Sequence, residues 1–143
     1  MLDNENSMEL IVELNYHQLF NRLRFLSRQY SKFTMCVNCD SEYSPIDILC
    51  RARFEFNDTI YLCYKTALKG EKHLGVKCST EAFNLGFLSN ELLKQEVLIV
   101  SNDNKTYSVC GVYIDEDNER IVLLNGYHNG NKVDWSYLSG GIY

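Results

Sequence analysis

Two cysteines of this sequence stand at a spacing that a metal ion can use. Cys36 and Cys39 are separated by two residues, which lets both thiolates bind one tetrahedral zinc ion. A closed site requires two further ligands, and His73 and Cys78 could supply them, although their spacing differs from that of a standard zinc knuckle. The alternative is that Cys36 and Cys39 bind no metal, because free cysteines commonly serve as small, partly buried apolar groups. We therefore expect no cofactor, with zinc as the alternative.

Nucleophilic catalysis requires a nucleophile, a base and a group that orients the base. The chain has three histidines, His17, His73 and His128, and no serine or cysteine stands in a nucleophile-elbow context. The acidic cluster at 115–119 is typical of a hairpin turn rather than of a paired-carboxylate site, and a phosphate-cradling glycine motif is absent. These absences predict a protein that is not an enzyme.

Basic residues gather in the N-terminal part of an acidic chain. The net charge is −5, yet no acidic residue lies between Leu14 and Cys39, where the basic residues are Arg22, Arg24, Arg28 and Lys32. Arg24, Arg28 and Lys32 are one helical turn apart, so they should form one positive ridge on a helix. The alternative is that these charges belong to an ordinary solvent-exposed helix face with no binding role. Together with Arg51 and Arg53, this ridge could contact phosphates. The acidic balance and the lack of a base-reading motif make nucleic acid the less favoured partner.

The aromatic content favours a protein partner. Ten tyrosines, seven phenylalanines and one tryptophan are more than a domain of this size is expected to bury completely, and tyrosine and tryptophan are enriched at interface centres. The segment 133–138, with Trp135 and Tyr137, is the predicted docking segment; the alternative is that both rings cover a β-meander. Arg24, Arg28, Arg51 or Arg53 beside an aromatic ring would also suit a small anionic ligand.

Residues 8–14 mostly alternate between apolar and polar and predict a first strand. The helix that would position the basic ridge follows this strand. Asn15 with Gln18 three residues later predicts a capping box that opens an amphipathic helix over 16–31. A second helical stretch is expected after a cap at Ser79, broken at Gly86 and restarted at Ser89.

Strand-like runs fill the rest of the chain. They are expected at 33–37, 51–56, 59–65, 74–78, 97–100, 106–114 and 121–124, with turns at Asn57–Asp58, 115–118, Asn125–Gly126 and Asn129–Gly130. Runs of strands with two helical zones predict a single α+β domain over 1–143. Its sheet would be mostly antiparallel, packed with one long N-terminal helix and a second, shorter helical segment.

The compartment follows from the N-terminus and the hydropathy. The first six residues are polar and acidic, unlike a signal peptide, and the longest apolar run, 97–100, is far too short to span a bilayer. We therefore expect a cytoplasmic protein with no membrane partner, in which the six cysteines are mostly reduced. A homodimer is the default oligomeric state.

Residues 87–125 carry a family resemblance. The stretch reads FLSNELLKQEVLIVSNDNKTYSVCGVYIDEDNERIVLLN, about a quarter of the chain. With its helix, its strand beginning near Glu96–Val97, its polar turn and its Gly-Val-x-Ile-Asp phrase, it resembles a helix-plus-β-meander module of small phage and mobile-element accessory proteins. The resemblance implies an origin and no catalytic residues.

The expected function combines that origin with the missing catalytic set. We expect a non-enzymatic inhibitor that blocks a host defence system, by occupying a protein surface or by sequestering a small anionic ligand, in the host cytoplasm. The alternatives are an immunity-like or chaperone-like partner of a bacterial effector, a zinc-stabilised module, and a nucleic-acid-binding protein.

Overall fold

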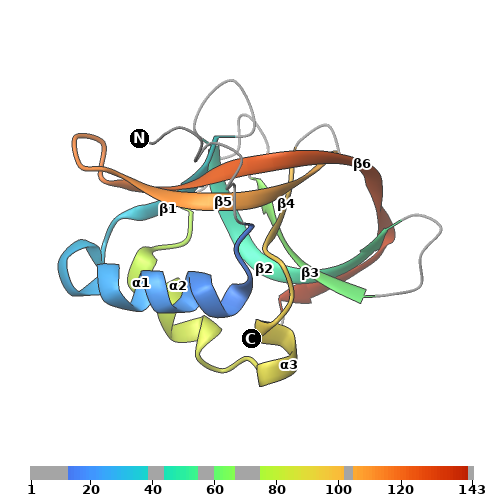
Figure 1. The fold of residues 1–143 in the computed structure, drawn as a ribbon, viewed down its shortest axis with the longest axis horizontal. Helices are drawn as coiled ribbons and strands as arrows, with labels where there is room; N and C mark the ends of the chain where they lie inside the picture. Colours follow the sequence, from blue (N-terminus) through green and yellow to red (C-terminus); the bar gives the residue numbers. More distant parts are fainter. Residues whose placement is uncertain (1–12, 39–43, 55–59, 67–74, 102–104, 142–143) are drawn as a thin grey trace, which may run out of the picture.

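Six β-strands close into a barrel, and three helices pack against one side of it (Figure 1). The computed structural model describes residues 13–38, 44–54, 60–66, 75–101 and 105–141. The elements in chain order are α1 (Tyr16–Tyr30), β1 (Thr34–Val37), β2 (Ser44–Phe54), β3 (Ile60–Thr66), α2 (Cys78–Leu85), α3 (Asn90–Leu93), β4 (Leu98–Val100), β5 (Lys105–Asp115) and β6 (Arg120–Gly141). This arrangement confirms the expected α+β class.

The barrel closes through its last and longest strand. The first part of β6 runs parallel to β1, with Thr34 opposite Arg120, and its far end runs antiparallel to β2, with Arg51 opposite Ser139. β3 and β4 form the other parallel pair, and the remaining neighbours are antiparallel. Closure pairs strand edges that would otherwise be open to other chains.

Helix α1 begins where the sequence predicts. Asn15 accepts a hydrogen bond from the backbone N–H of Gln18 at 2.8 Å, and the Gln18 side chain accepts one from the Asn15 backbone N–H at 2.9 Å. This reciprocal capping box satisfies donors that have no partner within the helix. The residue before the cap, Leu14, hydrogen-bonds to the backbone of Val109 and Val97, so the start of α1 is anchored to the sheet.

Helices α2 and α3 confirm the expected break. α2 ends at Leu85 with Gly86 as its C-cap, and Ser89 caps α3 by accepting a hydrogen bond from Leu92. The expected cap at Ser79 is wrong, because Lys77 occupies that position and the helix already begins at Cys78.

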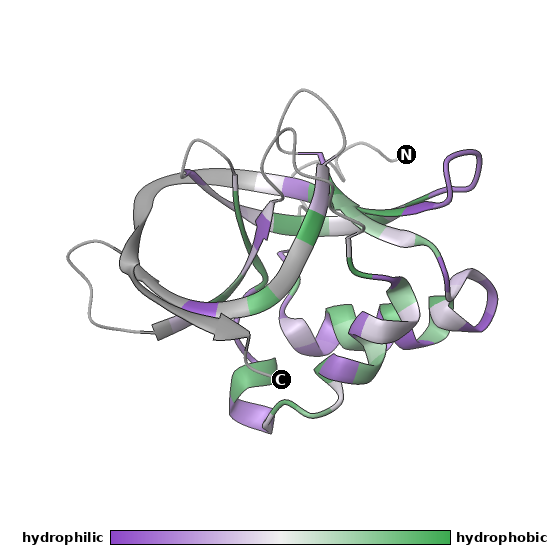
Figure 2. Ribbon diagram, turned by 180° about the vertical axis from the view of Figure 1, so that it is seen from behind, coloured by the Kyte–Doolittle hydropathy of each residue, from purple (hydrophilic) through white to green (hydrophobic). Residues whose placement is uncertain are grey.

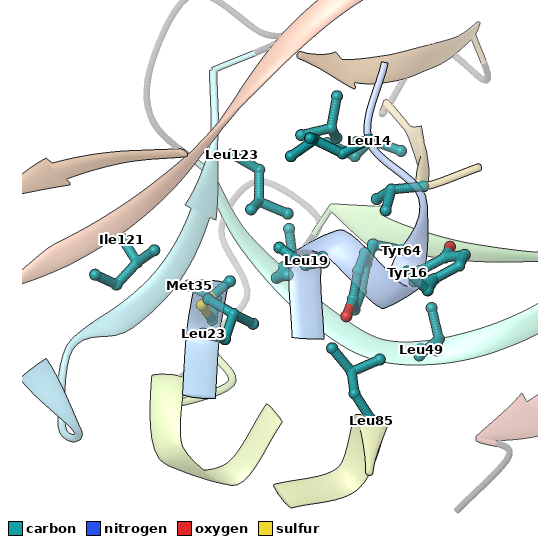
Figure 3. Packing of buried hydrophobic residues seen from close by; sticks show 14 of the residues in the cluster. Leu14, Tyr16, Leu19, Leu23, Met35, Leu49, Tyr64, Leu85, Ile121 and Leu123 are labelled. Carbon is teal, nitrogen blue, oxygen red and sulfur yellow. The ribbon is translucent and has the colours of Figure 1, made fainter. Parts of the chain in front are cut away.

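One hydrophobic core joins the helices to the barrel. It contains side chains from all six strands and from all three helices. Figure 3 shows Leu19 and Leu23 of α1, Leu85 of α2 and Tyr64 of β3 converging in it. Strand alternation explains the choice of residues on β1, where Met35 and Val37 enter the core while the residue between them faces the other way.

The expected strand over 74–78 is wrong over the residues that are described. Lys77 makes only a single bridge to Thr34, and Cys78 is helical. Gly75 in this connection has φ +73°, a left-handed conformation that ends any extended run. The expected strand over 8–14 and the turn at Asn57–Asp58 fall largely or wholly outside the described residues.

Both Asn–Gly turns expected near the C-terminus are wrong. Asn125–Gly126 and Asn129–Gly130 lie inside β6. The pairing with β5 changes register at these places, so the two dipeptides mark bulges in a long curved strand. A Cβ on Gly126 would lie 2.6 Å from Ser108 Oγ, which explains why glycine stands in the first of them.

Candidate functional site: two apolar grooves along helix α1

A groove of about 440 Å³ lies between α1 and the α2 region. We call it the α1–α2 groove, and its lining residues are Phe20, Arg24 and Ser27 from α1, Ser79, Ala82 and Phe83 from α2, and Gly86 and Phe87 beyond it. The three α1 residues follow one flank of the helix, because positions i, i+4 and i+7 lie above one another. Figure 2 shows that this helical part of the molecule carries both apolar and polar stretches.

Two phenylalanines of this groove remain in solvent. Phe83 is 67% exposed and Phe87 is 71% exposed, and their ring centroids lie 5.0 Å apart in an edge-to-face arrangement. Large exposed apolar rings that adjoin one another are typical of an interaction surface rather than of ordinary surface scatter. The pair forms the outer lip of the α1–α2 groove.

An arginine completes the opposite side of the same groove. The guanidinium carbon of Arg24 lies 5.1 Å from the centroid of the Phe20 ring, within cation–π range. A guanidinium that rests on a ring loses less conformational freedom when it binds an anion, and it still presents its N–H groups at the edge. Gly86 lies against the same ring, since a Cβ there would be 3.5 Å from Phe20 Cε1.

A second groove, of about 380 Å³, runs along the other flank of α1. We call it the α1–β5 groove, and it is lined by Asn21, Arg22, Phe25 and Leu26 of α1 and by Val112 and Ile114 of β5. Phe25 is 67% exposed. The guanidinium carbon of Arg28 lies 5.7 Å from its ring centroid, so a second arginine–phenylalanine pair borders this groove.

The electrostatic character of the two grooves is the same. Arg24 lines one and Arg22 lines the other, and among the described residues that line them there is no carboxylate. The expected positive ridge is carried by Arg24 and Arg28, both exposed on α1, while the exposed Lys32 follows the helix C-cap Ser31. A basic, aromatic strip therefore lies on a molecule whose net charge is −5.

The other predicted binding residues lie on the barrel. Arg51 and Arg53 are in β2, and the segment with Trp135 and Tyr137 is in β6, where Arg53 pairs with Asp134. The backbone of the predicted docking segment is therefore part of the sheet. The Arg51 side chain is exposed, while the side chains of Arg53, Trp135 and Tyr137 lie outside the description.

The two described cysteines of the predicted metal set are buried and face different surroundings. The Cys78 thiol donates to the carbonyl of Leu23 at 3.7 Å inside the core, and burial raises its pKa to about 11. Burial also raises the pKa of Cys36, which lies on the other face of β1 from the core. Cys39 and His73 lie outside the described residues. Within the described ranges, no three His, Cys, Asp or Glu side chains gather closely enough to hold a metal ion.

The phenylalanines are the functional candidates that sequence reasoning missed. The apolar stripe Leu19, Leu23 and Leu26 accounts for the buried face of α1 and assigns no role to Phe20 and Phe25. Their position on either side of that stripe is the signal that could have identified them. Phe83 lacked such a signal, because α2 is too short to show a clear apolar periodicity. Its position beside α1 is set by the fold.

Comparisons with known proteins leave the site to be interpreted from its own geometry. No protein-family model, no curated protein and no solved structure matches the chain. Among the described residues, no helix has the length and apolar character required to cross a membrane.

Proposed function

We propose that this protein is a non-enzymatic binding protein, and that the α1–α2 groove captures an acidic, partly apolar segment of a protein partner. One observation carries the proposal: Phe83 and Phe87, each about two-thirds exposed or more, adjoin one another at the lip of a groove whose other side holds Arg24 over Phe20. Burial of each exposed ring by a partner would contribute about 2 kcal/mol.

Charge selects the chemistry of the partner. Arg22, Arg24 and Arg28 lie on one helix with no acidic residue in its sequence, so an acidic segment is attracted and a basic one is repelled. The arginine fork favours carboxylate groups that it can bind with two hydrogen bonds. The partner segment should therefore place carboxylates next to aliphatic or aromatic side chains.

The biological role that we propose is inhibition by occupation of the partner's surface. The resemblance of residues 87–125 to phage and mobile-element accessory modules supports a component of a host defence system as the partner, met in the host cytoplasm. Inhibition of this kind requires tight contact with a surface and no turnover, which agrees with the lack of a catalytic motif in the sequence.

Selection from a displayed library of random 16-residue peptides tests the chemistry of the groove. We expect the enriched peptides to combine Asp or Glu with Leu, Phe or Trp, and their affinity to fall at least tenfold in the double variant Phe83→Ser/Phe87→Ser. Arg24→Glu should weaken them similarly and reduce their dependence on salt. All three side chains are exposed or line the open groove, so these variants should fold.

Tyr113→Ser is the matched control, because Tyr113 is an exposed aromatic residue on the face of β5 opposite Val112 and Ile114. Its loss should leave peptide affinity unchanged. Enrichment of basic peptides, or equal binding to the wild type and the double phenylalanine variant, would overturn the proposal. Tighter binding of a single-stranded oligonucleotide than of any peptide would replace it with a nucleic-acid function.

A further inference from the structure

The two grooves flank one helix, and we infer that a single acidic partner straddles α1 and inserts one apolar anchor into each groove. The inference rests on the proposed function for the α1–α2 groove and extends it to the α1–β5 groove. It assigns the exposed Phe25 and the arginines along α1 to one continuous interface.

The second groove resembles the first because an arginine and a phenylalanine of α1 line each of them. Arg22 and Phe25 stand beside Val112 and Ile114, and Arg28 lies over the Phe25 ring as Arg24 lies over Phe20. An isolated exposed phenylalanine is common on protein surfaces, but here a second arginine–phenylalanine pair borders a second groove of similar volume on the same helix, which favours one shared interface.

Helix geometry places the two units on opposite flanks. Phe20 and Phe25 are five residues apart, which in an α-helix is about 7.5 Å along the axis and about 140° around it. Arg24 and Arg28 are one turn apart and lie on the exposed ridge between the flanks. A partner that fills both grooves must therefore cross this ridge, where carboxylates would meet the guanidinium groups.

Charge argues against a second copy of this chain as the occupant. A two-fold contact through this face would bring Arg22, Arg24 and Arg28 of both copies together, and like charges across an interface are unfavourable. An acidic surface with two apolar anchors, such as a pair of helices or a hairpin, satisfies both the charge and the shape.

The test compares binders that carry one apolar anchor with binders that carry two, using the intact protein. Acidic two-helix hairpin mini-proteins are selected from a displayed library against the wild type, alongside the single 16-residue peptides. We expect hairpin binding to weaken at least tenfold in Phe25→Ser and, separately, at least tenfold in Phe83→Ser/Phe87→Ser. The single peptides should respond to only one of these changes. Tyr113→Ser is again the control, and urea unfolding verifies that each variant folds.

The outcomes separate this inference from the proposed function. Hairpins that respond to Phe83→Ser/Phe87→Ser but not to Phe25→Ser would overturn the two-groove interface and leave the α1–α2 groove standing. Hairpins that respond to neither change, or a library that yields no binder, would overturn both. A homodimer in sedimentation that Phe25→Ser dissociates would identify a second copy as the occupant and overturn the inference.

Discussion

The phenol of Tyr64 on β3 donates a hydrogen bond to the carboxyl group of Glu81 on α2, and both side chains are completely buried. Figure 3 shows the Tyr64 oxygen directed toward the helices. The Tyr16 ring lies beside Tyr64, with centroids 6.1 Å apart, and its hydroxyl donates to the carbonyl of Leu62 at 2.9 Å. The Tyr64–Glu81 contact holds α2, one wall of the α1–α2 groove, against the barrel, and the Tyr16 contacts hold the start of α1 against β3.

Removal of the Tyr64 hydroxyl should destabilise the protein. Tyr64→Phe keeps the ring but deletes a hydrogen bond to a buried carboxyl group, so we expect the free energy of unfolding to fall by about 1–3 kcal/mol. Urea unfolding followed by circular dichroism measures this loss. Tyr113→Phe, at a half-exposed position, should change stability by less than about 0.5 kcal/mol. Equal effects of the two substitutions would contradict the assigned role of the buried pair.

Stability should fall as pH rises through the range in which Glu96 ionises. Burial raises the pKa of Glu96 from 4.5 to about 7, and a hydrogen bond with Glu13 and its negative charge add to the effect. Below about pH 4.5 the carboxyl is protonated in both folded and unfolded chains and carries no penalty. Between pH 4.5 and 7 the unfolded chain ionises first, so the free energy of unfolding declines, and above pH 7 the loss is complete.

Glu96→Gln should remove this pH dependence. The Glu96 side chain is exposed, so solvent screening reduces the effect, and we expect a gain of about 1 kcal/mol at pH 8 and almost none at pH 4. Urea midpoints measured from pH 4 to pH 8 give the profile. The control is Glu91→Gln on α3, which should leave the slope in place. A wild-type profile that rises from pH 5 to pH 8 would contradict the assignment.

Gly75 should resist substitution. It has φ +73°, and a Cβ would lie 2.6 Å from Thr34 Cγ2 and 3.1 Å from Pro45 Cβ. Gly75→Ala should therefore cost about 2 kcal/mol through strain and crowding. Gly111→Ala is the matched control, since its Cβ would meet only Leu124 Cδ1 at an ordinary 3.6 Å. Thermal unfolding of both variants distinguishes a special position from a general intolerance of alanine.

The capping box should contribute measurably to α1. Asn15→Ala removes the side-chain acceptor of the Gln18 N–H and should cost about 1 kcal/mol. Asn21→Ala, in the exposed middle of the same helix, should be neutral or slightly stabilising because alanine is the better helix former. Chemical denaturation gives both values, and an equal loss in the two variants would show that the cap is not responsible.

Much of the fold could be predicted because its signals are local. The start of α1 needs only Asn15, Gln18 and the spacing of Leu19 and Leu23, all within one short stretch. The break at Gly86 and the restart at Ser89 are local in the same way. The turns predicted at the Asn–Gly dipeptides were wrong because the same residue types occur in hairpin turns and in strand bulges. Only the pairing of β6 with β5 distinguishes the two.

For the binding residues, too, some features follow from local sequence and others only from tertiary packing. The sequence alone indicated a basic helix on an acidic protein, since net charge and helical spacing can both be obtained from the order of residues. Closure of the barrel depends on β6 meeting β1 and β2 across long sequence separations, which no local pattern encodes. The exposure of Phe25, Phe83 and Phe87 depends on which flanks of α1 and α2 remain uncovered after that closure. Sequence therefore determined the charge and the helix, whereas tertiary packing decided which aromatic rings face a partner.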